Sequence, residues 1–300
     1  MAQTFMDRHA FLLRRLHSLS GVVPIGVFMM IHLVTNASIM WGLVKGDKYE
    51  GMHAGAVTFQ HEVDFIHSMP ALLLIEIFGL WLPIAFHAIL GAYYATKGRS
   101  NLSHYSRQNN WRYTLQRLTA WVGLVFIFWH VATLRWGWTF LLPEGVLWSA
   151  EYAGSTLAAV FQGLPVEAGV GMSPDEQVNA AGAVIVSGAY MLGVSALVFH
   201  LANGLWTAAI TWGITLSAKA QQRWGYVCAA IGVGLMGLAW AAIIGFMTID
   251  YDDALQAEQY LHDERAREAA EQMVGEPAKS GANDISVPVS YEDTTEGVDR

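Results

Sequence analysis

Residues 198–215, VFHLANGLWTAAITWGIT, place one histidine, His200, inside a run that is otherwise apolar enough to cross a lipid bilayer. Ionisable side chains are costly in the hydrocarbon core, so a histidine there by default marks a pathway, a ligand or a packed internal pair. Three more histidines have similar surroundings: His32 in VFMMIHLVTN, His87 in LPIAFHAILG and His130 in VFIFWHVATL. These four histidines, and the apolar runs that carry them, decide the fold class.

The composition places the chain among membrane proteins. Of its 300 residues, 54% are hydrophobic and only 14% charged, whereas about a quarter of the residues of a soluble domain are charged. Five apolar runs reach the roughly 20 residues that a membrane helix needs, at about 16–41, 70–95, 113–138, 182–213 and 225–248. We therefore predict an all-α membrane protein with five transmembrane helices. Segment 145–164 carries Glu151 and many small polar residues, which favours an interfacial or loop helix over a sixth span.

Residues 1–249 form the predicted membrane domain, and residues 250–300 form an acidic tail. The tail holds fourteen acidic and four basic residues, so it carries more than the whole net charge of −8. Residues 252–275 suit a polar, exposed helix, and the low hydrophobicity of 276–300 is typical of disorder. The tail is expected to be solvated and without chemistry of its own.

The single cysteine, Cys228, excludes an intrachain disulfide, a CxxC site and a cysteine-held iron–sulfur cluster within this chain. Metal chemistry must therefore use histidine. The sequence contains neither GxGxxG nor GxxxxGK, so nucleotide binding is unsupported, and no nucleic-acid partner is expected. The basic N-terminus lacks a convincing cleavage site, which indicates a retained helix.

The basic residues beside the spans predict the orientation. They precede the first span, lie between the second and third and follow the fourth: Arg8, Arg14, Arg15, Lys97, Arg99, Arg107, Arg112, Arg117, Lys219 and Arg223. The loops on the other side are rich in Asp and Glu. The positive-inside rule then puts the N-terminus in the cytoplasm, and five spans put the C-terminus outside.

Counting residues along each span places the four histidines at two depths. His32 and His130 lie about sixteen and seventeen residues beyond the cytoplasmic ends of spans one and three, near the outer face. His87 and His200 lie about seventeen and eighteen residues along the second and fourth spans, which enter from outside, so both are near the inner face. Two levels with two imidazoles each, roughly 15–20 Å apart, are what two stacked six-coordinate b-type haems in a four-helix bundle would require.

Glycines and a proline give this haem reading weak support. Gly123 and Gly193 lie seven residues before their histidines, and Gly21 lies eleven before His32, so each could leave room for a flat macrocycle. Small residues also serve helix packing in membranes. Pro83, four residues before His87, is expected to bend the second span and to free the carbonyl of Gly79.

Other readings of the histidines stay open. A buried histidine can be a packing group or part of a proton path, so a haem-free anchor and a proton-relay transporter are alternatives. A transporter would more often interrupt its helices at mid-membrane, and these histidines avoid the midplane.

Polar residues outside the spans are further candidates. His17 stands beside Arg14 and Arg15 at the start of the first span, where haem propionates, a quinone head group or a partner protein could meet it. The loop before the second span contains residues that could pass protons to or from a quinone, namely His53, His61, Glu62, Asp64 and His67. Their spacing matches no strong zinc signature.

The quoted histidine stretches closely resemble the diheme cytochrome b subunit, of the b558 type, that anchors bacterial succinate dehydrogenases and fumarate reductases. The resemblance covers nearly all of residues 11–248. Its most specific parts are RRLHSLSGVVPIGVF and IHL within 14–33, LPIAFHAILGAY at 82–93, NWRYTLQRLTAW and FIFWHV within 110–131, and residues 198–215.

The resemblance implies an inner haem held by His87 and His200 and an outer haem held by His32 and His130. It also implies a flavoprotein (FAD) subunit and an iron–sulfur subunit docked on the cytoplasmic side of the bacterial inner membrane. Electrons would pass from the iron–sulfur partner through the inner and outer haems to menaquinone. Some fumarate-reducing relatives carry a glutamate where this chain has Val198, which favours succinate oxidation here. The diheme anchor of another quinone-linked dehydrogenase is the alternative within this class.

Overall fold

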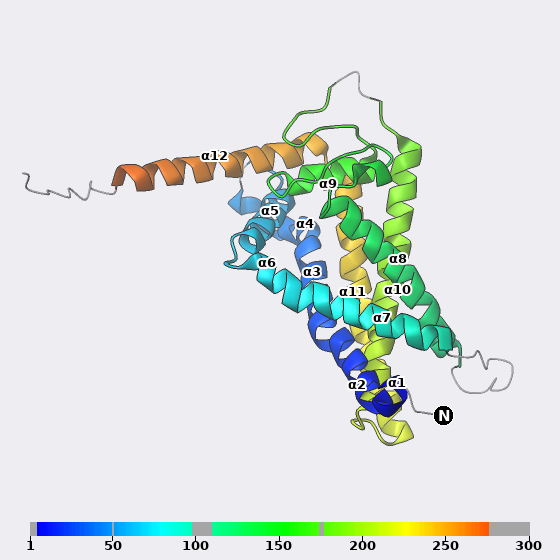
Figure 1. Cartoon of the computed structure of the whole chain (residues 1–300). Coiled ribbons are helices and arrows are strands. Elements are labelled where there is room, and N and C mark those ends of the chain that lie inside the picture. The colour runs from blue at the N-terminus through cyan, green and yellow to red at the C-terminus, as the bar shows by residue number, and fades with distance from the viewer. Residues whose placement is uncertain (1–4, 50, 98–109, 174–176, 276–300) are drawn as a thin grey trace, which may run out of the picture. The chain divides into compact units, whose positions relative to one another are not determined.

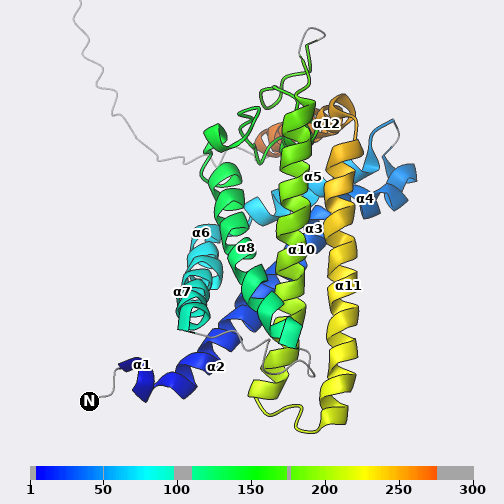
Figure 2. The same cartoon turned by 90° about the vertical axis from the view of Figure 1, so that its right-hand side faces the viewer.

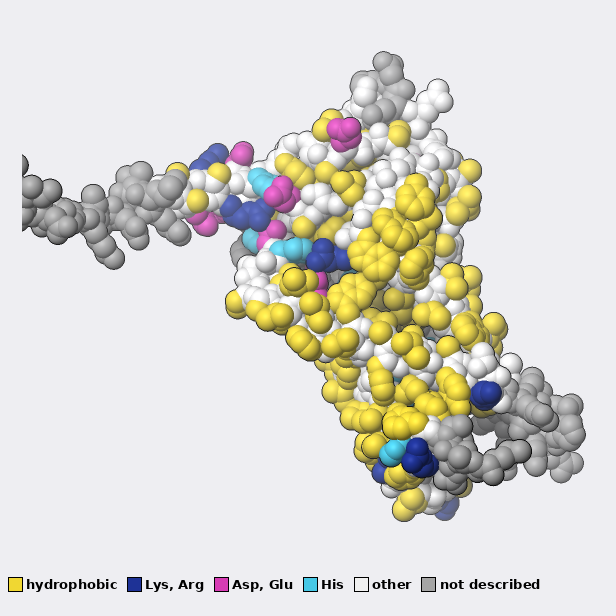
Figure 3. All heavy atoms as spheres, viewed as in Figure 1, with side chains coloured by type: hydrophobic (Ala, Val, Ile, Leu, Met, Phe, Trp, Pro, Cys, Tyr) yellow, Lys and Arg dark blue, Asp and Glu magenta, His cyan; other side chains and the backbone are white. Residues whose placement is uncertain are grey.

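The computed structural model describes residues 5–49, 51–97, 110–173 and 177–275, and every regular element within these ranges is a helix. Five helical segments are long and apolar enough to cross a membrane: Ala10–Gly46, Leu72–Lys97, Trp111–Leu134, Ala180–Thr211 and Ala218–Thr248. Hydrophobic side chains cover much of the face seen in Figure 3. The predicted all-α architecture with five spans is confirmed, and the protein is a multi-pass membrane protein.

The first span is a series of helical pieces. It contains α2 (Ala10–Ser20), the π-helical turn η1 (Gly21–Ile25), α3 (Gly26–Asn36), α4 (Ser38–Trp41) and the 3₁₀ turn η2 (Gly42–Lys48), preceded by α1 (Phe5–Arg8). Pro24 lies inside η1. Because proline has no backbone N–H, it interrupts the α-helical hydrogen-bond ladder at this point.

The second span has a similar interruption before its histidine. Ala71, with a φ of 58°, turns the chain into α6 (Leu72–Ile75), which continues through the π-helical turn η3 (Glu76–Trp81) into α7 (Leu82–Lys97). Pro83 is the second residue of α7, two positions after the end of η3, and its missing N–H leaves the carbonyl of Gly79 without an α-helical donor. The bend that the sequence predicts at Pro83 thus lies next to the wider, π-helical turn η3.

The remaining spans are continuous helices: α8 (Asn110–Leu134), α10 (Ala180–Thr211) and α11 (Ala218–Thr248). The side chains of Asn179 and Ser217 cap the last two by accepting hydrogen bonds from the amides of Gly182 and Ala220. Helix α10 packs against both α8 and α11, while α2 and η1 pack against α7 and α10 (Figures 1 and 2). The first four spans therefore form a bundle, and α11 lies outside it against α10 and α3.

We call the end of the bundle with the starts of α2, α8 and α11 the basic end, and the opposite end the cap end. The cap consists of α5 (Ala54–His67), α9 (Ala153–Gln162) and residues 251–261 of α12 (Tyr251–Gly275), with the 3₁₀ turn η4 (Thr139–Leu141) nearby in sequence. The predicted loop helix is present as α9, which is too short to span a bilayer. Its residues 153–161 are buried by protein, so α9 is a core helix of the cap.

Two buried polar side chains join the parts of the cap. Gln60, on α5, donates to the carbonyl of Ala150 at 2.8 Å and accepts from the amide of Ala153 at 3.1 Å. Glu258, on α12, is fully buried and accepts hydrogen bonds from the amides of Gly154 at 2.6 Å and Ser155 at 3.0 Å. It therefore caps α9 from a distant part of the chain.

Burial raises the pKa of Glu258 to about 7. The hydrogen bonds from Ser155 and Gly154 act in the opposite direction, and the charge of Asp64 adds to the increase. Removal from water is the larger effect, because a carboxylate loses much of its hydration when it is buried.

The chain divides into two compact units, residues 1–261 and 262–300. Within α12, Tyr251, Ala254, Leu255 and Leu261 are buried with the first unit, whereas residues 263–271 are exposed. The predicted polar helix is present, but its first eleven residues are not the exposed surface that the sequence indicated, because apolar residues three and four positions apart share one face. The predicted disorder of 276–300 lies outside the described residues.

Candidate functional site

The four histidines of the spans lie in two pairs. The ring centres of His87 on α7 and His200 on α10 are 6.2 Å apart, with planes at 89°. Those of His32 on α3 and His130 on α8 are 6.0 Å apart, with planes at 77°. We call these the basic-end pair and the cap-end pair. Each pair joins two different spans, as the depth count predicts.

The two pairs lie at different heights in the bundle. On α8, Gln116 contacts His200 of the basic-end pair, and His130 of the cap-end pair follows fourteen residues later. On α10, Tyr190 contacts His130 and precedes His200 by ten residues. At 1.5 Å per residue, the levels are roughly 15–21 Å apart.

Hydrogen bonds determine the tautomer of the basic-end pair. Nδ1 of His87 lies 2.9 Å from the carbonyl oxygen of His17, and Nδ1 of His200 lies 3.1 Å from that of Gln116. Because a carbonyl oxygen only accepts, each Nδ1 carries the hydrogen and donates it, which leaves the lone pair on Nε2. A neutral imidazole held in this way is prepared to bind a metal through Nε2.

The cap-end pair has side-chain neighbours instead. Nδ1 of His130 lies 3.1 Å from the hydroxyl of Tyr190, and both ring nitrogens of His32 lie 3.4 Å from the amide nitrogen of Asn36. The ring of Phe126 stacks on that of His130, with ring centres 5.7 Å apart. Polar contacts to the cap-end histidines therefore come from α10 and from α3 itself, while α8 supplies an aromatic neighbour.

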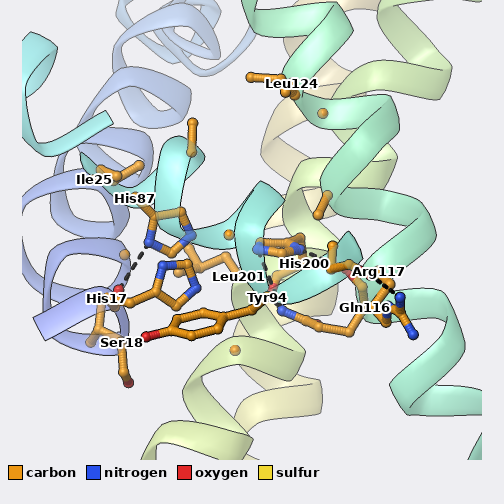
Figure 4. A pocket seen from close by; sticks show the side chains of 18 of the residues that line it. His17, Ser18, Ile25, His87, Tyr94, Gln116, Arg117, Leu124, His200 and Leu201 are labelled. Carbon is orange, nitrogen blue, oxygen red and sulfur yellow. Dashed lines mark hydrogen bonds between the residues drawn. The ribbon is translucent and has the colours of Figure 1, made fainter. Parts of the chain in front are cut away.

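A cavity of about 440 Å³ surrounds the basic-end pair. Figure 4 shows His17, His87 and His200 at this cavity, with Tyr94, Gln116 and Arg117 on its polar side. The ring of His17 stacks on that of His87, with ring centres 4.0 Å apart. The cavity thus combines apolar walls with a small number of polar groups, as cofactor sites commonly do.

The glycines have different surroundings at the two levels. A methyl group added at Gly21 would lie 2.5 Å from Cε1 of His87, and one at Gly123 would lie 2.6 Å from Cδ2 of Leu197. Both glycines line the basic-end cavity. Gly193 instead receives the ring of Phe126, so the absence of a side chain there allows an aromatic ring of the facing helix to approach.

The basic residues of the first span have separate environments. Arg14 lines the cavity, and its guanidinium lies 5.8 Å from the ring centre of Tyr94. The guanidinium of Arg15 lies over Phe11 and Trp212, at 4.3 and 5.2 Å from their ring centres. Arg14 and His17 therefore belong to the cavity, while Arg15 faces a neighbouring surface.

Four of the candidate proton residues, His61, Glu62, Asp64 and His67, lie on α5 of the cap but do not form one cluster. The fifth, His53, precedes α5 and caps its N-terminus, where Nδ1 accepts a hydrogen bond from the amide of Ala56 at 3.1 Å. Asp64 accepts a hydrogen bond from Gln60 at 2.9 Å, while Nδ1–H of His67 donates to the carbonyl of Val63 at 2.9 Å. His61 is exposed and Glu62 is half-buried. Within the described ranges, no group of three His, Cys, Asp or Glu side chains is arranged to hold a metal ion.

A comparison with known proteins gives the family. The chain is 32% identical over 237 residues, covering 79% of this chain and 97% of the relative, to the succinate dehydrogenase cytochrome b558 subunit of Bacillus subtilis (strain 168). This chain belongs to the succinate dehydrogenase cytochrome b558 family. No family model matches the chain, and no solved structure matches it.

In this member of the cytochrome b558 family, a polar network that the sequence analysis did not predict lies beside His200. Nε of Arg112 donates to Oδ1 of Asn203 at 2.8 Å, and Nδ2 of Asn203 donates to Oε1 of Gln116 at 2.8 Å. Nε2 of Gln116 in turn donates to the backbone carbonyl of His200 at 3.1 Å. Gln116 therefore contacts His200 with both its main chain and its side chain.

A sequence signal for this network existed. Arg112 and Gln116 are four residues apart on α8, and Asn203 is three residues after His200 on α10, so each pair shares a helix face. Polar residues in apolar helices rarely face lipid, which indicates that the two faces meet. No comparable local pattern pointed to Tyr190.

Proposed function

We propose that this chain is the membrane-anchoring cytochrome b subunit of a succinate dehydrogenase, and that two histidine pairs hold two haem b groups. His87 and His200 bind the inner haem, and His32 and His130 bind the outer one. The observation that best supports this proposal is the distance between the ring centres in each pair, 6.2 Å and 6.0 Å.

Both separations fit axial ligation of one metal atom by two imidazoles. A metal–imidazole bond is about 2.0–2.1 Å long, and a ring nitrogen lies about 1 Å from the centre of its ring. Two rings on opposite sides of one iron therefore have centres roughly 6 Å apart. The Nδ1–H donors of His87 and His200 support the same proposal, because they leave the lone pair of each ring on Nε2, the nitrogen that would hold the iron.

The chain places and tunes the haems. When bound, each haem supplies a one-electron carrier whose potential depends on its axial ligands and on burial. At the inner site, Arg14, Arg117 and Tyr94 line the polar side of the cavity, so they suit the carboxylates of the propionates. His17 packs against the ring of His87, and Arg15, which faces away from the cavity, suits a contact with a partner subunit.

The proposed complex has its soluble subunits at the basic end. By the positive-inside rule this end faces the cytoplasm, where an FAD-containing flavoprotein oxidises succinate and an iron–sulfur subunit delivers the electrons. His87 and His200 would hold the haem that lies nearer to these partners and would take up the electrons first, and His32 and His130 would hold the haem nearer the cap end, where menaquinone would be reduced. His61, Glu62, Asp64 and His67 on α5 are the proposed sources of protons at that end.

Purification of the tagged chain with its partners in mild detergent tests this function. We expect a flavin-linked succinate oxidase to co-purify, and a reduced-minus-oxidised spectrum to give two b-type haems per chain. The control variant His9→Gln changes an exposed histidine outside the spans and should leave both haems in place. A haem-free chain would contradict the haem proposal, and co-purification with a different dehydrogenase would contradict the succinate assignment.

A further inference from the structure

A second hollow lies outside the histidine sites and is lined by residues from the start of α8 and from α10 and α11. The neighbouring course of α10 and α11 can be followed in Figure 2. We call this hollow the α10–α11 groove. Its volume is about 840 Å³, and none of the four paired histidines lines it. The groove lies at the basic end, because it begins beside the first turns of α8 and α11. It therefore lies at the depth where the head groups of one leaflet are expected.

Arg112 is the only charged side chain among the described residues that line this groove. Its Nε donates a hydrogen bond to Oδ1 of Asn203, and its guanidinium lies 4.1 Å from the ring centre of Trp206. Its two terminal nitrogens have no acceptor within the described part of the chain, and no Asp or Glu lines the groove. Asn203 and Trp206 thus hold the guanidinium in place, while its two terminal nitrogens have no acceptor in the described structure. This arrangement favours the binding of an anion.

The walls of the groove suit an acyl chain. Ala202 on α10 faces Gly232 on α11, where an added methyl group would lie 3.0 Å from Cβ of Ala202, so the floor is closely packed. The side chain of Val233 is 74% exposed. From Gln222 to Met236, α11 contributes lining residues over fourteen positions or roughly 21 Å, more than the 15 Å or so of one hydrocarbon leaflet.

Aromatic side chains mark the head-group level of the same groove. Trp111, Trp206 and Tyr226 line it beside Arg112, and Trp and Tyr prefer the interface between head groups and hydrocarbon. A cation, an aromatic rim and an apolar channel therefore follow one another in the order of the parts of a phospholipid.

We infer that the α10–α11 groove binds one anionic phospholipid, with its phosphate on the guanidinium of Arg112 and an acyl chain along α10 and α11. Basic pockets between membrane helices are suited to such head groups. The inference is independent of the haem proposal, because it uses none of the four histidines.

Native mass spectrometry of the purified complex tests this site, with phosphatidylglycerol and phosphatidylcholine as probes. We expect one phosphatidylglycerol to remain bound, at least ten-fold more tightly than phosphatidylcholine. Arg112→Gln removes the cation, and Ala229→Leu fills the groove at an exposed position without touching Arg112. Each should weaken the binding of phosphatidylglycerol at least ten-fold. Arg112→Gln does so by loss of one charge-assisted contact, and Ala229→Leu does so by taking up space for the acyl chain.

Lys219→Gln is the matched control, because it removes an exposed charge of α11 that does not line the groove. It should retain the lipid. Equal binding of the two lipids by the unchanged complex, or wild-type binding in both groove variants, would overturn the inference. So would loss of the iron–sulfur subunit from both variants without any bound lipid in the unchanged complex, since the groove would then be a protein interface.

Discussion

Replacing Asn203 with leucine removes the centre of the polar network beside His200 while nearly preserving side-chain size. Asn203 is 3% exposed, so water has little access to the groups left behind. The substitution breaks the bonds to Arg112 and to Gln116, each 2.8 Å long. Gln116 keeps its main-chain contact to His200 but loses the support that fixes its side chain.

The expected loss of stability is about 2 kcal/mol. Hydrogen bonds between helices in membranes contribute about 0.6 kcal/mol on average, and bonds to charged groups contribute about 1.5–3 kcal/mol. For the Arg112 hydrogen bond we use the lower end of the 1.5–3 kcal/mol range, because this side chain is half-buried and open to the α10–α11 groove. A loss of about 2 kcal/mol is roughly a thirty-fold change in the equilibrium.

Denaturant titration of the purified complex, followed by the absorbance of each haem, measures this effect. The inner haem of Asn203→Leu should be lost at lower denaturant concentration than that of the unchanged chain, and before the outer haem. Ser187→Ala is the control, since its buried hydroxyl on α10 makes only a 3.5 Å contact with the carbonyl of Phe161. Equal losses in the two variants, or earlier loss of the outer haem, would refute the reasoning.

Three further substitutions test other contacts. The pKa of Glu258 is raised from 4.5 to about 7, so its stabilising effect is fully present below about pH 4.5 and is lost as pH rises through 7. Glu258→Gln should therefore abolish a pH dependence of about 3 kcal/mol, measured by hydrogen exchange of the α9 amides at pH 5 and 8. Gly21→Ala should displace the ring of His87 and lower inner-haem content. Gly237→Ala should not, because the added methyl group would meet no neighbouring atom within 4 Å. Tyr190→Phe should raise the potential of the outer haem by about 20–60 mV in a redox titration, because loss of one hydrogen bond makes the axial imidazole less basic, and it should leave the inner potential unchanged.

The spans and the two histidine levels could be predicted from the sequence because a membrane restricts the possible structures. A span must be helical and about 20 residues long, so hydropathy and residue counts place each histidine in depth. That count paired His87 with His200 and His32 with His130, and the rings of each pair lie about 6 Å apart. Ligation of haem by these rings stays a prediction.

The cap could not be predicted in the same way, because its contacts join segments far apart in sequence. Glu258 caps α9 across 104 residues, and Gln60 reaches Ala153 across 93. A carboxylate within a polar helix carries no local pattern that indicates such a partner, so the sequence suggested only an exposed surface. The four candidate proton residues on α5 were identified by type alone, and type does not determine which way each side chain faces.

The pairing of the histidines is tested most directly by counting haems in four alanine variants of the purified complex, at His32, His87, His130 and His200. We predict two haems per chain in the unchanged protein and one in each variant. The variants at His87 and His200 should lose the same spectral component, and those at His32 and His130 should lose the other. A variant that keeps both haems, or loss of different components by the two members of one pair, would contradict this arrangement.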